Sequence, residues 1–246
     1  MPASPILIVT RPAPDGQSFA AAVEKALGEP GYTILSPAFT IAPCAAEPPP
    51  DYAALIFTSG NGVAQAVRLG ARSVPAFCVG DRTADRARAA GFDATSAGGD
   101  ADALVAHLMN IRPTTPLVHV TGAERRGAVA ERLTEAGMPC QTVVAYRQDP
   151  MGPTPALDAA AGGTRPVVVP VFSPRSALPI LALDWHAPLH VVAMSAAVAE
   201  ATAGVHPDTM TISEEPTGNG MCDKTLMVLR GLLDRGVRLE GRGAAG

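Results

Sequence analysis

Hydroxyl-bearing residues, glycines and arginines recur in this sequence directly after short apolar runs, whereas acidic residues and histidines are scarce at those places. Each apolar run predicts a buried parallel strand, and ligands of open parallel sheets bind at the carboxyl ends of the strands. Hydroxyls and the free N–H groups of helix N-termini donate hydrogen bonds to carboxylates and phosphates. The pattern therefore predicts a ligand rich in acceptor oxygens. The residues concerned are Thr10, Arg11, Thr58, Ser59, Gly80, Thr121, Gly122, Tyr146, Ser173 and Ser195.

A plainer explanation is open for the same hydroxyls, because Ser and Thr also cap the N-termini of helices. For Thr83 taken alone, which opens a predicted helix, capping is the better explanation. The concentration of small polar groups at many strand ends favours ligand binding for the set as a whole.

Other catalytic and ligand-binding motifs are incomplete or absent in the sequence. Residues 218–225 (GNGMCDKT) approximate a phosphate-binding loop, but Asp223 stands where a glycine must precede the lysine. His186 and His190 are four residues apart, yet Pro188 between them prevents a shared helical face for a metal. The sequence also lacks GxSxG and a GxGxxG that follows a strand. A nucleotide-dependent or metal-dependent enzyme is therefore not supported.

The apolar runs alternate with amphipathic, alanine-rich segments along almost the whole chain. The runs are continuous, which is typical of strands covered on both faces, and strand–helix repetition implies parallel pairing. The fold class predicted is doubly wound α/β. The predicted strands are residues 6–10, 33–35, 54–57, 75–79, 117–120, 142–146, 167–172, 189–193 and 209–212. The predicted helices are residues 18–27, 61–69, 83–90, 100–109, 126–136, 176–183, 198–203 and 222–234.

A weak internal repeat indicates two similar domains. Residues 56–63 (IFTSGNGV) align with residues 170–177 (PVFSPRSA), so that Ser59 matches Ser173, and residues 79–84 (VGDRTA) align with residues 194–199 (MSAAVA). Repeated units in one order suggest a duplicated domain. The alternative is that any two doubly wound halves look alike. Proline-rich stretches at 36–50 and 148–155 are predicted to be connections, because neither suits a central strand or helix.

Composition excludes several classes of function. The formal net charge of −4 leaves no general basic surface for nucleic acid. No apolar run approaches the ~20 residues that a membrane span needs, and no signal peptide is visible. The four cysteines form no CxxC pair, which is typical of reduced thiols. We expect a cytoplasmic, globular protein that binds neither nucleic acid nor membrane.

Five segments in a fixed order resemble the uroporphyrinogen-III synthase family. They are residues 9–12 (VTRP), 57–63 (FTSGNGV), 79–84 (VGDRTA), 121–146 (TGAERRGAVAERLTEAGMPCQTVVAY) and 172–177 (FSPRSA). The resemblance implies two flavodoxin-like parallel-sheet domains joined by a two-stranded linker, with the active-site cleft between them. Residues 1–37 and 150–246 would form the first domain, residues 44–142 the inserted second domain, and residues 38–43 and 143–149 the linker strands. A monomer is expected.

The resemblance also implies the family's activity in tetrapyrrole and heme biosynthesis. Hydroxymethylbilane, a linear tetrapyrrole, is cyclised to uroporphyrinogen III with inversion of ring D and loss of water, and no cofactor is used. Because the substrate carries many carboxylates, strand-end groups and arginines would bind it. The substrate-binding residues implied are Arg11, Thr58, Ser59, Asn61, Gly80, Thr83, Gly122, Ser173, Ser195, Ala197 and Val198, with Arg82, Arg126, Arg147 and Arg175 as further cations.

Tyr146 stands where the family's proposed acid lies. A tyrosine of ordinary pKa near 10 is protonated at neutral pH and can give a proton to the departing hydroxyl group. The alternative is a tyrosine that merely packs against the linker. Among the histidines only His119 approaches a predicted strand end, and it is expected to point away from Thr121.

The second copy of the VGxxTA turn departs from the family pattern. Ser195 replaces a typical glycine and Val198 a threonine, so that only Thr83 offers a hydroxyl at this position. Replacing Val198 by Thr is accordingly expected to be neutral or mildly favourable. The departures keep open a second class of function, a non-catalytic ligand-binding or regulatory homologue that retains the cleft.

Overall fold

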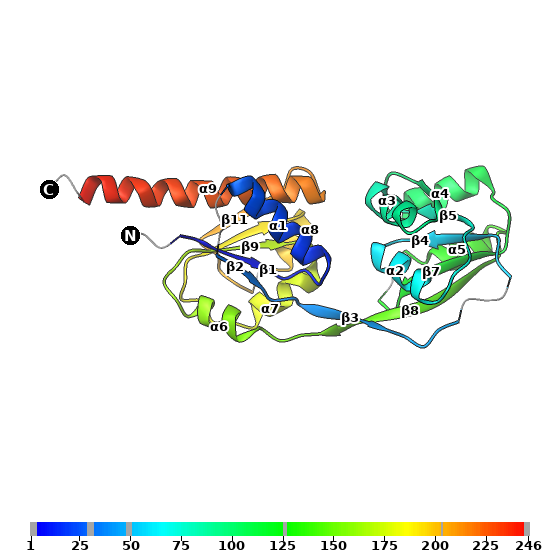
Figure 1. Cartoon of the computed structure of the whole chain (residues 1–246), viewed down its shortest axis with the longest axis horizontal. Coiled ribbons are helices and arrows are strands. Elements are labelled where there is room, and N and C mark those ends of the chain that lie inside the picture. The colour runs from blue at the N-terminus through cyan, green and yellow to red at the C-terminus, as the bar shows by residue number, and fades with distance from the viewer. Residues whose placement is uncertain (1–3, 29–31, 48–50, 125–126, 203, 244–246) are drawn as a thin grey trace. The chain divides into compact units, whose positions relative to one another are not determined.

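The computed structural model describes residues 4–28, 32–47, 51–124, 127–202 and 204–243, and its chain divides into two compact units. The terminal unit comprises Met1–Thr40 and Pro150–Gly246, and the central unit comprises Ile41–Asp149. Each unit contains its own sheet. The fold class expected from the sequence, α/β with parallel sheets, is confirmed in both (Figure 1).

The terminal unit contains a five-stranded sheet in the order β11-β10-β9-β1-β2, with parallel pairing throughout. Its strands are β1 (Ile6–Val9), β2 (Tyr32–Leu35), β9 (Val167–Val171), β10 (Leu189–Ala193) and β11 (Thr209–Ile212). Its helices are α1 (Asp15–Leu27), α6 (Pro155–Ala161), the 3-10 turn η1 (Pro174–Ala177), α7 (Leu178–Leu181), α8 (Ala196–Glu200) and α9 (Gly218–Gly243).

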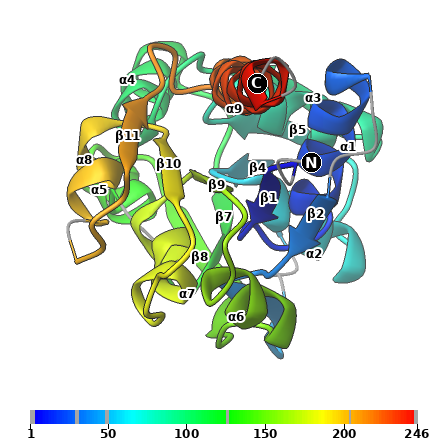
Figure 2. The same cartoon turned by 90° about the vertical axis from the view of Figure 1, so that its left-hand side faces the viewer.

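Helices cover both faces of this sheet, as continuous apolar strands require. Alternate residues of a strand face opposite sides, so Ile6 and Ile8 of β1 pack with α6, α7 and α8. Leu7 and Val9 pack with α1 and α9 instead. Figures 1 and 2 show α1 and α9 on one side of the sheet and α6 and α7 on the other. The doubly wound arrangement is therefore a direct result of the strand pattern.

The central unit holds a six-stranded sheet in the order β3-β8-β7-β4-β5-β6. Its strands are β3 (Phe39–Pro43), β4 (Ala54–Phe57), β5 (Pro75–Cys78), β6 (Asp93–Ser96), β7 (Leu117–Gly122) and β8 (Cys140–Pro150). Its helices are α2 (Gly60–Arg68), α3 (Asp81–Ala89), α4 (Ala101–Ile111) and α5 (Val129–Glu135). From β8 to β6 neighbouring strands run parallel.

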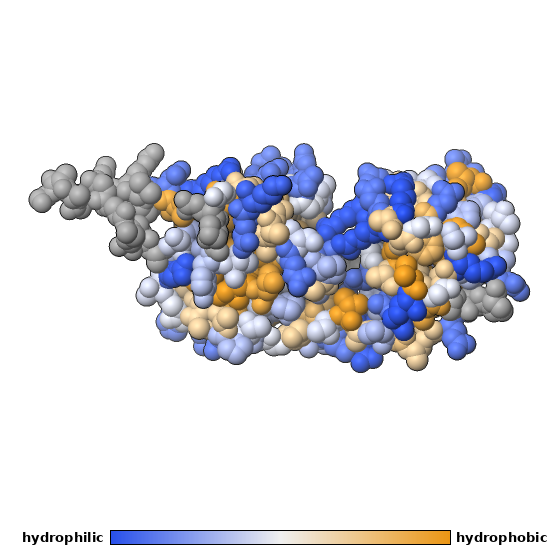
Figure 3. All heavy atoms as spheres, viewed as in Figure 1, coloured by the Kyte–Doolittle hydropathy of each residue, from blue (hydrophilic) through white to orange (hydrophobic). Residues whose placement is uncertain are grey.

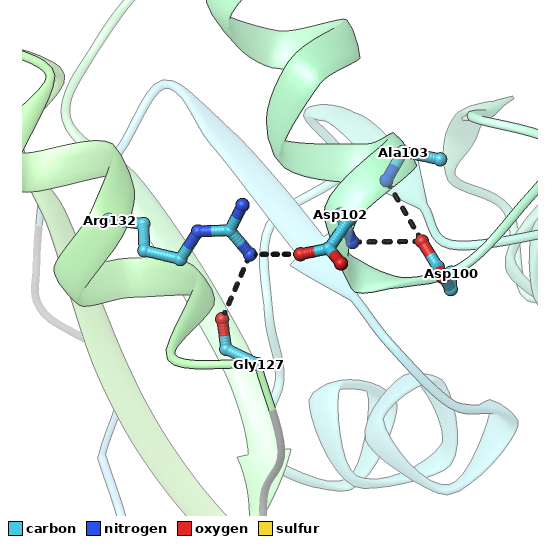
Figure 4. A network of polar contacts seen from close by, with 5 residues as sticks. All are labelled: Asp100, Asp102, Ala103, Gly127 and Arg132. Atoms are coloured by element: carbon cyan, nitrogen blue, oxygen red, sulfur yellow. Dashed lines mark hydrogen bonds and ion pairs between the residues drawn. The ribbon is translucent and has the colours of Figure 1, made fainter.

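Helices also cover both faces of the central sheet. Leu55 and Phe57 pack with α2 and α3, whereas Ala54 and Ile56 pack with α4 and α5. On the α4–α5 side, Arg132 of α5 donates a 2.6 Å hydrogen bond to the carboxylate of Asp102 at the start of α4 (Figure 4). Asp100 caps α4 by accepting the N–H groups of Asp102 and Ala103, both at 3.0 Å. The contact between Arg132 and Asp102 joins two helices that residues 112–128 separate in sequence.

The structure corrects several predictions about elements. Helix α6 was not predicted, and β3 forms an edge strand inside the proline-rich stretch 36–50 that predicted a connection. β6 was not predicted, because its sequence DATS lacks an apolar run and it lies at the edge of the sheet. β8 extends to Pro150, although the prolines of 148–155 predicted a connection there. A proline is tolerated at the end of a strand, where no further ladder hydrogen bond depends on its missing N–H. Which residues form the linker stays a prediction.

Apolar residues lie scattered among polar residues on the face seen in Figure 3. Within the part of the chain that the structure describes, no helix is both long and apolar enough to cross a membrane.

Replacing Gly62 by Ala tests the close packing of α2 against β7. A Cβ at Gly62 would lie 2.6 Å from the carbonyl oxygen of Val120, so the helix would have to shift. We expect the free energy of unfolding to fall by about 1–2 kcal/mol, because the overlap outweighs the better helix propensity of alanine. Urea denaturation measures the change.

Gly152→Ala is the matched control, since nothing lies within 4 Å of a Cβ at Gly152. This control should leave the unfolding midpoint unchanged. If Gly62→Ala is as stable as the control, α2 does not depend on this close approach.

Candidate active site

Several predicted site residues lie close together in the central unit, at the carboxyl ends of β4 and β7 and at Tyr146 in β8. Tyr146 was expected at a strand end, but β8 continues beyond it to Pro150. Ser59 follows β4 with an extended backbone and caps α2, its Oγ accepting the N–H of Gly62 at 3.2 Å. The same Oγ lies 2.9 Å from the hydroxyl oxygen of Tyr146, close enough for a hydrogen bond. The structure thus brings together two residues that are 87 positions apart in the sequence.

Tyr146 lies over the end of the neighbouring strand. Its side chain is buried, and Gly122 at the end of β7 leaves the space that the ring occupies. A Cβ at Gly122 would lie only 2.7 Å from Cε2 and 2.8 Å from Cζ of Tyr146. Gly122 therefore positions the tyrosine ring by the absence of a side chain, a role that the sequence reading did not assign to it.

The environment of Tyr146 favours its neutral form. Burial raises the pKa of the hydroxyl above its ordinary value, and the nearby Glu124 carboxylate adds to the rise. The hydrogen bond with Ser59 opposes part of it, lowering the pKa. Tyr146 consequently keeps its proton throughout the neutral pH range.

Thr58 and His119 form a second polar pair beneath the same turn. Thr58 lies between β4 and Ser59, and its Oγ1 lies 3.2 Å from Nε2 of His119. His119 is buried in β7, two residues before Thr121. The expectation that His119 points away from Thr121 was wrong in principle, because residues i and i+2 of a strand share a face. Alternation along the strand was the signal that could have identified His119.

Gly80 and Thr83 begin α3, and Asn61 lies in the first turn of α2. Gly80 takes the N-cap position with an extended backbone. The N–H of Thr83 donates to the carbonyl of Gly80 at 3.0 Å, so this N–H is used inside the protein. The Thr83 side chain is mostly buried, whereas Asn61 is half-buried.

In the terminal unit Ser173 and Ser195 cap helices, as the capping explanation proposes, whereas Thr10 is fully buried and does not cap α1. Ser173 and Ser176 form a reciprocal capping box at η1. Ser195 caps α8, its Oγ accepting the N–H of Val198 at 3.4 Å. The Val198 side chain is buried in the core and Ala197 is exposed. Val198→Thr would therefore bury a hydroxyl in an apolar core, and the expectation that it is neutral or favourable is withdrawn.

Among the predicted cations, Arg11 and Arg147 each bind a carboxylate of the protein. Arg11 donates a 2.8 Å hydrogen bond to Asp15, and its guanidinium lies 4.2 Å from the centre of the Phe172 ring. Arg147 is bound by both carboxylate oxygens of Asp149, at 2.6 and 3.0 Å. Arg82 is exposed at the start of α3, Arg175 lies half-buried in η1, and Arg126 falls outside the described residues.

The described residues hold no cluster of three or more His, Cys, Asp or Glu side chains that could bind a metal ion. The geometry therefore defines an α/β protein whose candidate site consists of hydroxyls, glycines and helix N-termini at the carboxyl ends of parallel strands.

Comparison with known proteins identifies the family. The family model for "Uroporphyrinogen-III synthase HemD" matches residues 18–223, so the chain belongs to the uroporphyrinogen-III synthase family. Among curated proteins, none matches the sequence.

Two solved structures share the fold. The chain is similar to the uroporphyrinogen-III synthetase of Helicobacter pylori, with 16% identity, a TM-score of 0.61, and coverage of 92% of this chain and 100% of that one. It is also similar to a mutant uroporphyrinogen III synthase of the extremely thermophilic bacterium Thermus thermophilus, with 15% identity, a TM-score of 0.50, and coverage of 95% and 100%.

Gly122→Ala tests whether the missing side chain positions Tyr146. The new Cβ would overlap the tyrosine ring, which must then move away from Ser59. We expect the ring resonances of Tyr146 to shift in nuclear magnetic resonance spectra and the protein to lose about 1–3 kcal/mol of stability. The assignment of those resonances comes from Tyr146→Phe. Unchanged tyrosine spectra in a folded Gly122→Ala variant would contradict this role.

Proposed function

We propose that this chain is a uroporphyrinogen-III synthase, a cyclising lyase that converts hydroxymethylbilane to uroporphyrinogen III with inversion of ring D and loss of water. Membership of the family supports the activity. The observation that carries the proposed chemistry is the buried, neutral Tyr146 hydroxyl held 2.9 Å from Ser59. That the protein is cytoplasmic and monomeric stays a prediction.

Tyr146 would act as the acid in this reaction. Its proton passes to the hydroxyl group of the substrate as the carbon–oxygen bond breaks, and water leaves. The pyrrole carbon that forms the closing bond then releases a proton, which returns Tyr146 to its neutral form. General acid catalysis of this kind contributes about 10²–10⁴-fold, and the remainder must come from holding the chain ends in place.

Strand-end groups of the central unit would bind substrate carboxylates. The α2 N-terminus, where Asn61 lies, and the α3 N-terminus, where Gly80 and Thr83 lie, offer hydrogen-bond donors and a favourable dipole to anions. Arg11, Ser173, Ser195 and the neighbouring Ala197 and Val198 would contribute from the terminal unit. In that unit the hydroxyls already cap helices, so these roles have less support than those around Tyr146.

We also propose a flavodoxin-like fold for the terminal unit. Counted along the chain, the terminal sheet has the strand order 2-1-3-4-5, which is the flavodoxin-like order. Counted from β4 to β8, the central sheet has the order 3-2-1-4-5, which is found in dinucleotide-binding folds. The strand order thus supports the flavodoxin-like description for the terminal unit, while the central unit departs from it. We propose residues 38–43 and 143–149 as the linker strands.

A non-catalytic ligand-binding homologue is the second candidate. The burial of Val198 favours it, because the terminal unit then lacks the hydroxyl that a threonine would offer at this turn. The intact Ser59–Tyr146 pair favours the enzyme.

Tyr146→Phe tests the proposed acid, because it removes the hydroxyl and keeps the ring. We expect turnover of enzymatically generated hydroxymethylbilane to fall by roughly 10²-fold, with a stability change below about 1 kcal/mol. Because burial raises the pKa of Tyr146, the wild-type rate should show no loss from tyrosine ionisation between pH 7 and about 9. The ratio of isomer III to isomer I, separated by chromatography, reports the reaction.

Tyr52→Phe is the matched control for this experiment. Tyr52 lies in the same unit, is equally buried, and its hydroxyl accepts the N–H of Arg72 at 2.6 Å. Its replacement should leave turnover unchanged. Near-normal turnover by Tyr146→Phe would assign the proton to water or to a substrate carboxyl instead, and a wild-type protein that yields only isomer I would support the non-catalytic homologue.

Thr83→Ala tests carboxylate binding at the α3 N-terminus. A hydrogen bond to a charged group contributes about 1.5–3 kcal/mol, so the variant should lose roughly ten- to a hundredfold in kcat/KM. Thr83→Ser, which keeps the hydroxyl, should recover most of the loss. Equal kinetics of wild type and a folded Thr83→Ala variant would leave Thr83 no role beyond the start of its helix.

A further inference from the structure

His119 is a buried titratable side chain that the proposed mechanism does not use. Its side chain is 1% exposed in the middle of β7, and its neighbours across the sheet are Ile56 and Thr142. A polar ring in such a place is costly unless it forms hydrogen bonds. Its Nε2 forms one with Thr58, whose Oγ1 lies 3.2 Å away.

Thr58 occupies a sensitive position, because it directly precedes Ser59. The turn between β4 and α2 has to place the Ser59 Oγ at two partners at once, the N–H of Gly62 at 3.2 Å and the hydroxyl of Tyr146 at 2.9 Å. A small rotation at Thr58 would move the Ser59 side chain away from Tyr146. The hydrogen bond between His119 and Thr58 connects the turn to β7 just before this point.

Backbone packing ties the same turn to the same strand. Gly62, in the first turn of α2, approaches the carbonyl of Val120 so closely that a Cβ would lie 2.6 Å from it. Val120 is the residue after His119. One side-chain contact and one backbone contact therefore fix the start of α2 against β7, and Gly122 of the same strand supports the ring of Tyr146.

We propose that His119 is a positioning residue for the acid: it holds Thr58, and through Thr58 it keeps the Ser59 hydroxyl in hydrogen-bond contact with Tyr146. This inference rests on the proposed function for its kinetic consequence. Its structural content, that His119 controls the Ser59–Tyr146 contact, is independent of any activity.

The kinetic test is a double-mutant cycle. His119→Phe should lower kcat by roughly tenfold with KM within about twofold of wild type, because the substrate-binding groups remain and the acid is misplaced. In a Tyr146→Phe background the same change should have no further effect on kcat, since the acid is already absent. His119→Gln should restore most of the activity, because its side-chain amide can also hydrogen-bond to Thr58.

His190→Phe is the matched control. His190 is a second buried histidine bound to a threonine, with Nδ1 2.8 Å from the Oγ1 of Thr209 in the terminal unit. Its loss should lower stability in a similar way and leave kcat unchanged. If His119→Phe does not fold, Thr58→Val removes the same hydrogen bond from its other end and must show the same non-additivity with Tyr146→Phe.

A readout without substrate completes the test. The ¹³Cζ resonance of Tyr146 should shift in His119→Phe and in Thr58→Val, return toward its original position in His119→Gln, and stay in place in His190→Phe. Additive losses in the double-mutant cycle, or an unshifted Tyr146 resonance in both variants, would overturn the proposal. Should the wild type leave only isomer I, the proposed function fails, and the resonance alone decides whether His119 positions Tyr146.

Discussion

The hydrogen bond between Ser59 and Tyr146 spans an entire strand. Ser59 follows β4 and Tyr146 belongs to β8, and in the sheet β7 lies between these two strands. The tyrosine ring can reach Ser59 only by crossing the end of β7, where a Cβ would fall 2.7 Å from it. Glycine at position 122 is thus a geometric requirement of the contact, and a register shift between Thr121 and Gly122 falls at the same place.

The packing around this contact also depends on small side chains. Strands buried on both faces need small, branched or unbranched aliphatic side chains, and this core is built mainly from Ala, Val and Leu. Gly62 brings α2 against the backbone of β7, and the α2 N-terminus is therefore held beside the tyrosine. Two pairs of phenylalanine rings pack together, Phe19 with Phe172 at 5.0 Å and Phe57 with Phe92 at 5.5 Å between ring centres. Ser59 and Thr58 follow the end of β4, where a substrate carrying many carboxylates would meet them.

The weak internal repeat in the sequence corresponds to a backbone geometry that the two units share at the start of their helices. Ser59 and Ser173 align in this repeat, and both cap a helical turn with an extended backbone. Their ψ angles are 156° and 159°, respectively. Gly80 and Ser195 begin their helices in the same conformation. The side-chain partners differ: Ser59 binds Tyr146, whereas Ser173 binds Ser176. The same backbone turn therefore places a serine against the candidate acid in the central unit, whereas in the terminal unit its serine forms only a capping box.

The sequence predicted those features that depend on local pattern, including the strands with continuous apolar runs and the residues at their ends. It could not predict features that depend on three-dimensional neighbours. The edge strand β6 needs few apolar residues because one of its sides has no partner strand. Whether Val198 faces a ligand or the core depends on how α8 lies on its sheet, which no motif records. The sequence suggested that Gly122 binds substrate, but in the structure the ring of Tyr146 packs against it. Val198 and Gly122 were noted in the sequence, and the role of each was decided by neighbours distant in sequence. The candidate site is therefore a property of the sheet order rather than of any single motif.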